Sequence, residues 1–223
     1  MAQTAHQFSH EIRRTAHLGY LLHVPPNPIS ERLPLILFLH GAGERGNDLQ
    51  KVKIHGIPKV VEANPAFPFI TISPQCPEGT SWPLLVDELA ALVGEVERDQ
   101  PVDPSRRYLT GLSMGGYGSW ALGSARPEMW AAMVPICGGG SWLFGFPERV
   151  VSLAGTPVWA FHGAKDNVVP LRESSILVER LQKAGGNAKL TVYPEADHDS
   201  WTQTYADPEL YRWLLEQRKG CAV

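Results

Sequence analysis

Six short apolar runs recur along the chain, and each ends at a glycine or a proline. The runs are continuous rather than alternating, which is typical of strands covered on both faces of a parallel sheet. Segments with a helical repeat of apolar residues lie between several of them. Strands that alternate with helices predict an α/β fold with right-handed crossovers. The predicted strands cover residues 33–41, 69–74, 107–111, 131–139, 157–163 and 188–194.

Four helices and one leading pair of strands complete the predicted pattern. The first helix places leucines and valines on one face and has a proline near its first turn. The stretch 138–156 has no clear element and is a candidate wall or short lid over a site. We predict helices at 83–99, 114–125, 171–186 and 208–219, and an antiparallel pair at 10–14 and 18–24.

The length and the net charge of the chain limit the number of domains and the classes of partner. A chain of 223 residues suits a single domain over 1–223, and its formal net charge of −3 argues against nucleic acid or an anionic membrane as the main partner. The first 14 residues lack the apolar core of a signal peptide, and no apolar run is long enough to span a membrane. We therefore expect a cytoplasmic protein that acts on a small molecule, with oligomeric state left open.

The cysteines predict neither a disulfide framework nor a metal site. Cys76, Cys137 and Cys221 are widely spaced and odd in number, which is typical of free thiols. We expect no metal and no organic cofactor.

The segment Gly111–Gly115, GLSMG, matches the pattern G-x-S-x-G. This pattern indicates a nucleophile only where it joins a strand to a helix. It follows a predicted strand and precedes a predicted helix. A sharp turn of this kind strains the serine backbone, and the flanking Gly111 and Gly115 avoid a clash because they lack Cβ atoms. The hydroxyl of Ser113 then stands at a helix N-terminus, where a developing anion is favoured. We predict that Ser113 is a nucleophile.

A serine nucleophile needs a base, and the base needs a carboxylate. His198 lies in a loop between the last predicted strand and the last helix, from which it can reach across the sheet edge. Asp166 follows the preceding strand by a few residues, so we predict the order Ser113, Asp166, His198. Asp197 and Asp199 are weaker candidates because they adjoin His198. The histidines at 40 and 162 are expected to shape their turns, and those at 6, 10, 17, 23 and 55 to be surface or structural residues.

The glycine-rich segment 40–48, HGAGERGND, follows the strongest apolar run and can supply an oxyanion hole. We expect one main-chain donor from Met114 and the other from Ala42, with Gly43 as the alternative. The segment lacks the lysine and hydroxyl residue of a phosphate-binding P-loop, which argues against that interpretation.

Four segments together resemble serine hydrolases of the α/β-hydrolase superfamily. They are HGAGERG, GLSMGGYGSW, HGAKDNVVP and DHDSW. The resemblance is greatest to small esterases grouped with dienelactone hydrolases, phospholipase/carboxylesterases and polyhydroxybutyrate-depolymerase-like proteins, and PQCPEGTSW adds to it. It implies a mostly parallel sheet with helices on both faces and no large cap domain. It also implies ester hydrolysis through an acyl-enzyme, with Ser113, His198 and Asp166 as nucleophile, base and acid. Dienelactone hydrolases carry cysteine at the nucleophile, so the resemblance does not extend to their lactone substrate.

Aromatic residues near the predicted strand ends are candidates for the substrate pocket. Because no large cap is visible, an open site for short- to medium-chain esters is expected. Peptidase, thioesterase or acyltransferase chemistry on the same residues is the alternative, and a non-catalytic binding module is a third hypothesis. The pocket candidates are Trp82, Trp142, Phe144, Phe146 and Trp201.

Overall fold

Seven strands form a single sheet in the order β1-β3-β2-β4-β5-β6-β7. The structure is a computed structural model that describes residues 3–11, 13, 15–26, 28 and 30–220. Only β1 is antiparallel to its neighbour, and all other pairs are parallel. The strands are β1 (Tyr20–His23), β2 (Leu33–Leu39), β3 (Ile70–Pro74), β4 (Val102–Leu112), β5 (Ala132–Ile136), β6 (Val158–Gly163) and β7 (Ala188–Tyr193).

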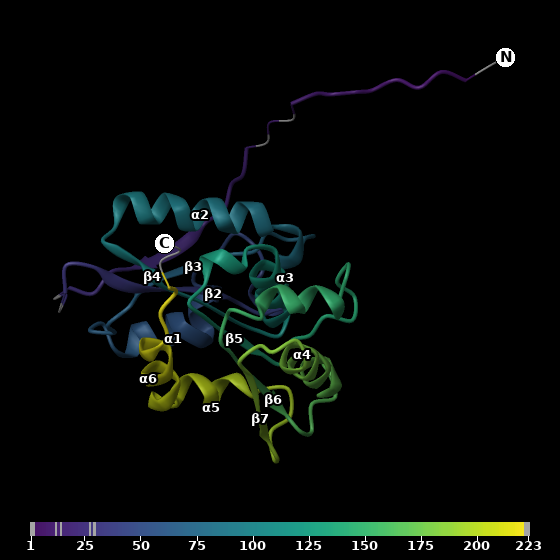
Figure 1. Ribbon diagram of the computed structural model, residues 1–223. Coiled ribbons are helices and arrows are strands. Elements are labelled where there is room, and N and C mark those ends of the chain that lie inside the picture. The colour runs from purple at the N-terminus through teal and green to yellow at the C-terminus, as the bar shows by residue number, and fades with distance from the viewer. Residues whose placement is uncertain (1–2, 12, 14, 27, 29, 221–223) are drawn as a thin grey trace.

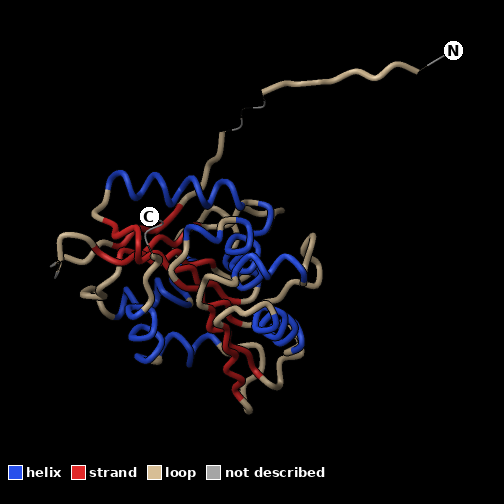
Figure 2. The backbone as a smooth tube through the Cα atoms, in the orientation of Figure 1, coloured by secondary structure: helices blue, strands red, loops and turns tan. Residues whose placement is uncertain are grey.

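Helices cover both faces of this sheet, in a three-layer arrangement (Figures 1 and 2). On one face lie α2 (Val86–Asp99), α3 (Met114–Ala125) and α4 (Arg172–Lys183); on the other lie α1 (Gly56–Ala63), α5 (Trp201–Ala206) and α6 (Pro208–Glu216). Strand β2 shows why both faces close, because its side chains alternate between two apolar cores. Leu35 and Leu37 pack with α2, whereas Ile36 and Phe38 pack with α1.

The strands and helices depart from the sequence-based prediction in three places. β1 pairs with β3 rather than with residues 10–14, of which those at 10, 11 and 13 form no strand and those at 12 and 14 lie outside the described residues. β4 begins at Val102, five residues earlier than predicted, because Val102 pairs with Leu33 of β2. The short helices α1 and α5 were not predicted, since neither has enough turns for a clear helical repeat.

The remaining predicted helices form with trimmed ends. α3 spans the predicted residues, α4 and α6 end earlier, and a 3-10 helix at Trp82–Leu84 replaces the first turn predicted for α2. The stretch 138–156 contains only a 3-10 helix at Glu148–Leu153. Within the described part of the chain, no helix has the length and apolar character needed to cross a membrane.

Candidate active site

Ser113 occupies a strained turn between β4 and α3. Its backbone has φ +52° and ψ −115°, in a region that side-chain-bearing residues rarely adopt, and its N–H donates to the carbonyl of Ile136 on β5 at 3.0 Å. Strain of this kind costs about 1–3 kcal/mol and persists where the surroundings enforce it. The turn holds the serine at the carboxyl edge of the sheet and at the start of α3.

Two glycines allow the turn to form. A Cβ on Gly115 would lie 1.9 Å from the carbonyl oxygen of Leu39, and one on Gly111 would lie 2.4 Å from the carbonyl oxygen of Gly115. Both obstacles are backbone atoms that cannot swing aside. The close approach of α3 to the end of β2 therefore requires glycine, as the G-x-S-x-G pattern predicts.

A continuous hydrogen-bonded chain joins Ser113, His198 and Asp166. The Nε2 of His198 lies 2.9 Å from the Oγ of Ser113, and its Nδ1 lies 2.7 Å from Oδ2 of Asp166. A carboxylate can only accept, so Nδ1 carries a proton and donates it to Asp166. In the neutral imidazole Nε2 is then free to accept the Ser113 hydroxyl proton. The structure thus brings together three residues that are far apart in sequence.

Asp166 is held in place by more than His198. Its Oδ1 accepts from the main-chain N–H groups of Val168 and Val169, each at 2.9 Å, while Oδ2 faces the imidazole. Burial by itself would raise the pKa of Asp166, but the hydrogen bonds from His198 and from these two amides hold the pKa below its ordinary value. The carboxyl group is therefore ionised at neutral pH.

The aspartates that flank His198 have other partners. Asp197 accepts from the N–H of Asp199, and Asp199 accepts from both the N–H and the hydroxyl of Thr202 at the start of α5. These contacts shape the loop that carries His198. Of the three candidates, only Asp166 has a described hydrogen bond to the imidazole.

A second imidazole, that of His162, is fully buried and also contacts Asp166. Its Nε2 lies 2.8 Å from the Val169 carbonyl and 3.3 Å from Oδ2 of Asp166, and its Nδ1 lies 2.8 Å from the hydroxyl of Ser174. Burial lowers the pKa of His162, although Val169 and Asp166 oppose that shift. The sequence predicts only that His162 shapes its turn. The spacing of four residues to Asp166 carries no signal for a contact, because His162 lies in β6 and Asp166 in the loop that follows it.

The two expected oxyanion donors begin neighbouring elements. Met114 is the first residue of α3, and Ala42 is the first residue of the 3-10 helix Ala42–Glu44. The first N–H groups of a helix have no acceptor within that helix. Among the described residues, no hydrogen bond occupies either N–H. Both remain proposed donors, with Gly43 as the alternative to Ala42.

Comparison with known proteins decides the family. The sequence model of the phospholipase/carboxylesterase family matches residues 67–209, which include Ser113, Asp166 and His198. The chain belongs to this family.

Similar proteins of known structure share the fold of this phospholipase/carboxylesterase-family chain. A thermostable esterase is 33% identical, with a TM-score of 0.76 over 91% of this chain and 60% of its own. Est1E from Butyrivibrio proteoclasticus is 18% identical, with a TM-score of 0.66 over 90% of this chain and 94% of its own, and supports the fold alone. The predicted α/β-hydrolase fold is confirmed.

A curated relative covers less of the chain. A carboxymethylenebutenolidase-like protein of Escherichia coli (strain K12) is 28% identical over 102 residues. This match spans 43% of the family member described here and 37% of the length of the relative.

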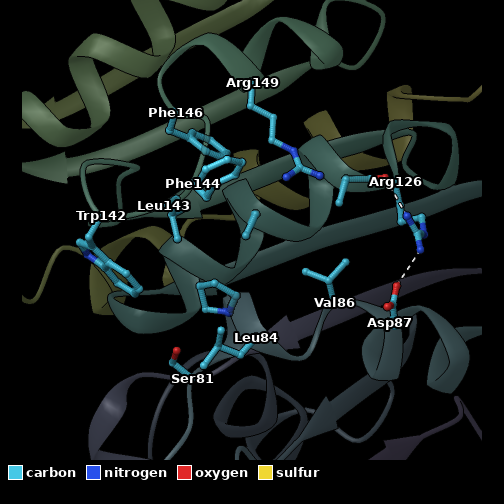
Figure 3. A pocket seen from close by; sticks show the side chains of 13 residues that line it. Ser81, Leu84, Val86, Asp87, Arg126, Trp142, Leu143, Phe144, Phe146 and Arg149 are labelled. Carbon is cyan, nitrogen blue, oxygen red and sulfur yellow. Dashed lines mark hydrogen bonds and ion pairs between the residues drawn. The ribbon is translucent and has the colours of Figure 1, made fainter. Parts of the chain in front are cut away.

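The aromatic pocket candidates lie in different surroundings. Trp142, Phe144 and Phe146 line a groove of about 630 Å³ (Figure 3), whereas Trp201 lines a separate cavity of about 240 Å³ and packs edge-on against His198. The expectation that Trp82 lines a substrate pocket was wrong. Trp82 is fully buried, and its indole N–H donates to the carbonyl of His40, so it supports the start of the segment 40–48 that carries the proposed oxyanion donor.

Two cysteines are described, and both are buried free thiols, as predicted; Cys221 lies outside the described residues. Cys137 lies beside the candidate catalytic residues, with ligand atoms of Cys137, Asp166 and His198 within 4.8 Å of one another. Burial raises the pKa of the Cys137 thiol to about 12, so the thiol is protonated at neutral pH. Metal binding requires the thiolate, and we do not propose a metal centre here.

The neutral imidazole of His40 ties the start of the segment 40–48 to Cys76. Its Nδ1 donates to the Gly41 carbonyl at 2.6 Å, and its Nε2 accepts from the N–H of Cys76 at 2.9 Å. Burial lowers the pKa of His40 from 6.5 to about 4; the Gly41 hydrogen bond opposes this shift, and Arg45 adds to it. A proton on Nε2 would break the bond from Cys76. The hydrogen bonds confirm the expected structural role.

This arrangement predicts a loss of stability in weak acid. Because the pKa of His40 is lower in the folded than in the unfolded chain, the unfolded chain binds more protons between pH 6.5 and about 4. The contribution of His40 to stability is therefore complete above pH 6.5 and is lost as pH falls through that range, by about 3 kcal/mol. Urea unfolding at several pH values measures it. A His40→Gln variant should show a smaller loss over the same range, and parallel profiles would contradict the prediction.

Proposed function

We propose that this protein is a serine carboxylesterase acting on short- to medium-chain esters. The observation that carries the proposal is the hydrogen-bonded chain from Ser113 through His198 to Asp166, set on a strained turn at the start of α3. Membership of the phospholipase/carboxylesterase family and the esterase fold support ester hydrolysis as the chemistry.

The geometry supports a two-step reaction. Ser113 Oγ attacks the ester carbonyl carbon while His198 Nε2 takes the hydroxyl proton, and the carbonyl oxygen becomes an oxyanion facing the N–H groups of Ala42 and Met114. The intermediate collapses, the ester C–O bond breaks, and His198 gives its proton to the leaving alcohol. Water then attacks the acyl carbon with His198 again as base, the C–O bond to Ser113 breaks, His198 returns the proton to Ser113 Oγ, and the acid departs. Asp166 stays ionised and steadies the imidazolium.

Labelling with a fluorophosphonate followed by peptide mapping tests this function. We expect the label on Ser113 and loss of labelling in Ser113→Ala, because only an activated serine reacts at a useful rate. Hydrolysis of nitrophenyl esters from acetate to palmitate should be highest for short and medium chains. A folded protein that takes no label would support the binding-module hypothesis, and a labelled protein that prefers aminoacyl amides would identify a peptidase.

A further inference from the structure

A groove of about 630 Å³ runs along the later turns of α3, between Leu84 on one wall and Trp142 and Phe144 on the other. Trp142 stacks on Tyr117 with 4.6 Å between ring centroids, and Tyr117 lies one helical turn beyond Ser113. Ala121 and Ala125 line the groove and continue the same stripe, since residues four apart share a helix face. At 1.5 Å per residue, the stripe from Ser113 to Ala125 is roughly 18 Å long.

The lining of the groove combines exposed apolar side chains with charged ones, and its floor on α3 is open. Every residue of α3 is buried except Ala121 and Ala125, whose small side chains leave the space above the helix free. The walls carry Leu84, which is 70% exposed, and Phe144, which is 95% exposed. The volume of the groove is that of a small-molecule site.

The loop that carries the aromatic wall is anchored at its base. The carboxylate of Glu173, on α4, accepts from the N–H groups of Gly140 and Ser141 at 3.2 and 3.0 Å. These bonds fix the chain immediately before Trp142. The segment that carries the aromatic wall is therefore fixed to α4 at its start.

Among the described residues that line the groove, Arg149 is a cation without an ion-pair partner. Figure 3 shows Arg149 pointing into the space between the walls, with Trp142 at one end and Arg126 and Asp87 at the other. Asp87 binds Arg126 at 2.7 Å, so these two charges cancel. Among the described residues, the ion pairs next to the groove join Asp87 to Arg126 and Glu148 to Arg180, and none includes Arg149. The groove as a whole therefore carries a net charge of +1.

We infer that this groove holds the non-reacting part of an ester substrate that is extended, apolar and ends in an anionic group, with Arg149 binding the anion. The inference rests on the proposed esterase function and adds to it the class of substrate. The apolar part would lie on Ala121 and Ala125 between Leu84 and Phe144. A guanidinium suits a terminal carboxylate, phosphate or sulfate because it can donate two parallel hydrogen bonds.

Matched pairs of esters test the inference. On the acyl side, nitrophenyl half-esters of dicarboxylic acids from adipate to dodecanedioate are compared with nitrophenyl esters of monocarboxylic acids of equal length. On the alcohol side, acetates of long hydroxy acids are compared with acetates of the corresponding alcohols. We expect one side to show higher kcat/KM for the anionic ester, by about five- to tenfold for the longer chains. Added salt should reduce that ratio by screening.

Variants connect the preference to the groove. Arg149→Glu should abolish or invert the ratio of kcat/KM between anionic and neutral esters. Arg98 is an exposed arginine at the C-terminal end of α2, away from the residues of α2 that line the groove, and Arg98→Glu should keep the ratio. Ala121→Leu fills the groove without altering a charge. It should lower kcat/KM for long esters of both kinds while leaving the ratio for the shortest pair unchanged.

The outcomes separate the two proposals. Absence of Ser113-dependent hydrolysis of nitrophenyl acetate would overturn the esterase function and this inference with it. Hydrolysis of acetate with no anionic preference on either side, or with a preference that Arg149→Glu leaves intact, would overturn the inference alone. So would a stable dimer in light scattering that Phe144→Ser dissociates, since a second copy of the chain would then cover the groove.

Discussion

Alanine at Ser113 or at His198 is expected to lower kcat/KM for the preferred ester by about ten thousand- to a million-fold, and the double variant should be no slower than either single one. The nucleophile and its base act as a unit, because the Ser113 hydroxyl is a weak nucleophile unless Nε2 of His198 takes its proton over the 2.9 Å between them. Steady-state kinetics with enzyme freshly purified from each variant measures this, with circular dichroism to confirm folding.

A pair of isosteric substitutions provides the control for this prediction. Asp166→Asn should cost about ten thousand-fold, because an amide that donates to Nδ1 favours the wrong tautomer of His198. Asp197→Asn should leave activity within a few-fold, because its amide oxygen can still accept from the N–H of Asp199. Equal losses in both variants would contradict the assignment of Asp166.

Gly115→Ala is expected to lower the free energy of unfolding by about 3 kcal/mol or more. The added Cβ would lie 1.9 Å from the Leu39 carbonyl oxygen and 2.8 Å from that of His40, so α3 must move away from the end of β2. Activity should fall as well, since Ser113 directly precedes this helix. Urea unfolding monitored by tryptophan fluorescence measures the change.

Gly94→Ala is the matched helical control. Gly94 lies in α2, is exposed, and a Cβ there would meet no atom within 4 Å. Alanine should therefore stabilise the protein by about 0.5–1 kcal/mol through its higher helix propensity. Similar small effects at both glycines would show that the close packing of α3 on β2 is not needed for the fold.

The candidate catalytic residues could be predicted from the sequence because of a property of parallel sheets. All parallel strands end at the same edge, so side chains that follow successive strands meet there whatever their separation along the chain. Ser113 follows β4, Asp166 follows β6 and His198 follows β7. The apolar runs placed these strand ends, and the glycines around Ser113 marked the sharp turn.

The contacts around these residues could not be predicted, because they depend on tertiary packing and not on a local sequence pattern. β1 joins β3 because the edge of the sheet is free there, and Trp82 is buried beneath His40 while Trp142 is exposed on Tyr117. The same residue type thus supports a loop in one place and lines a groove in the other.

What the sequence by itself determined was the order of the parallel strands and of the four longer helices, the α/β fold class and the candidate residues for the chemistry. Strand periodicity, glycine spacing and motif context are local properties that can be recognised in the sequence. A parallel sheet brings the residues that they mark to the same edge. Only the tertiary structure decided that His162 contacts Asp166 and that Arg149 faces an open groove. Those contacts join segments whose side chains meet through packing, and packing depends on the whole chain at once.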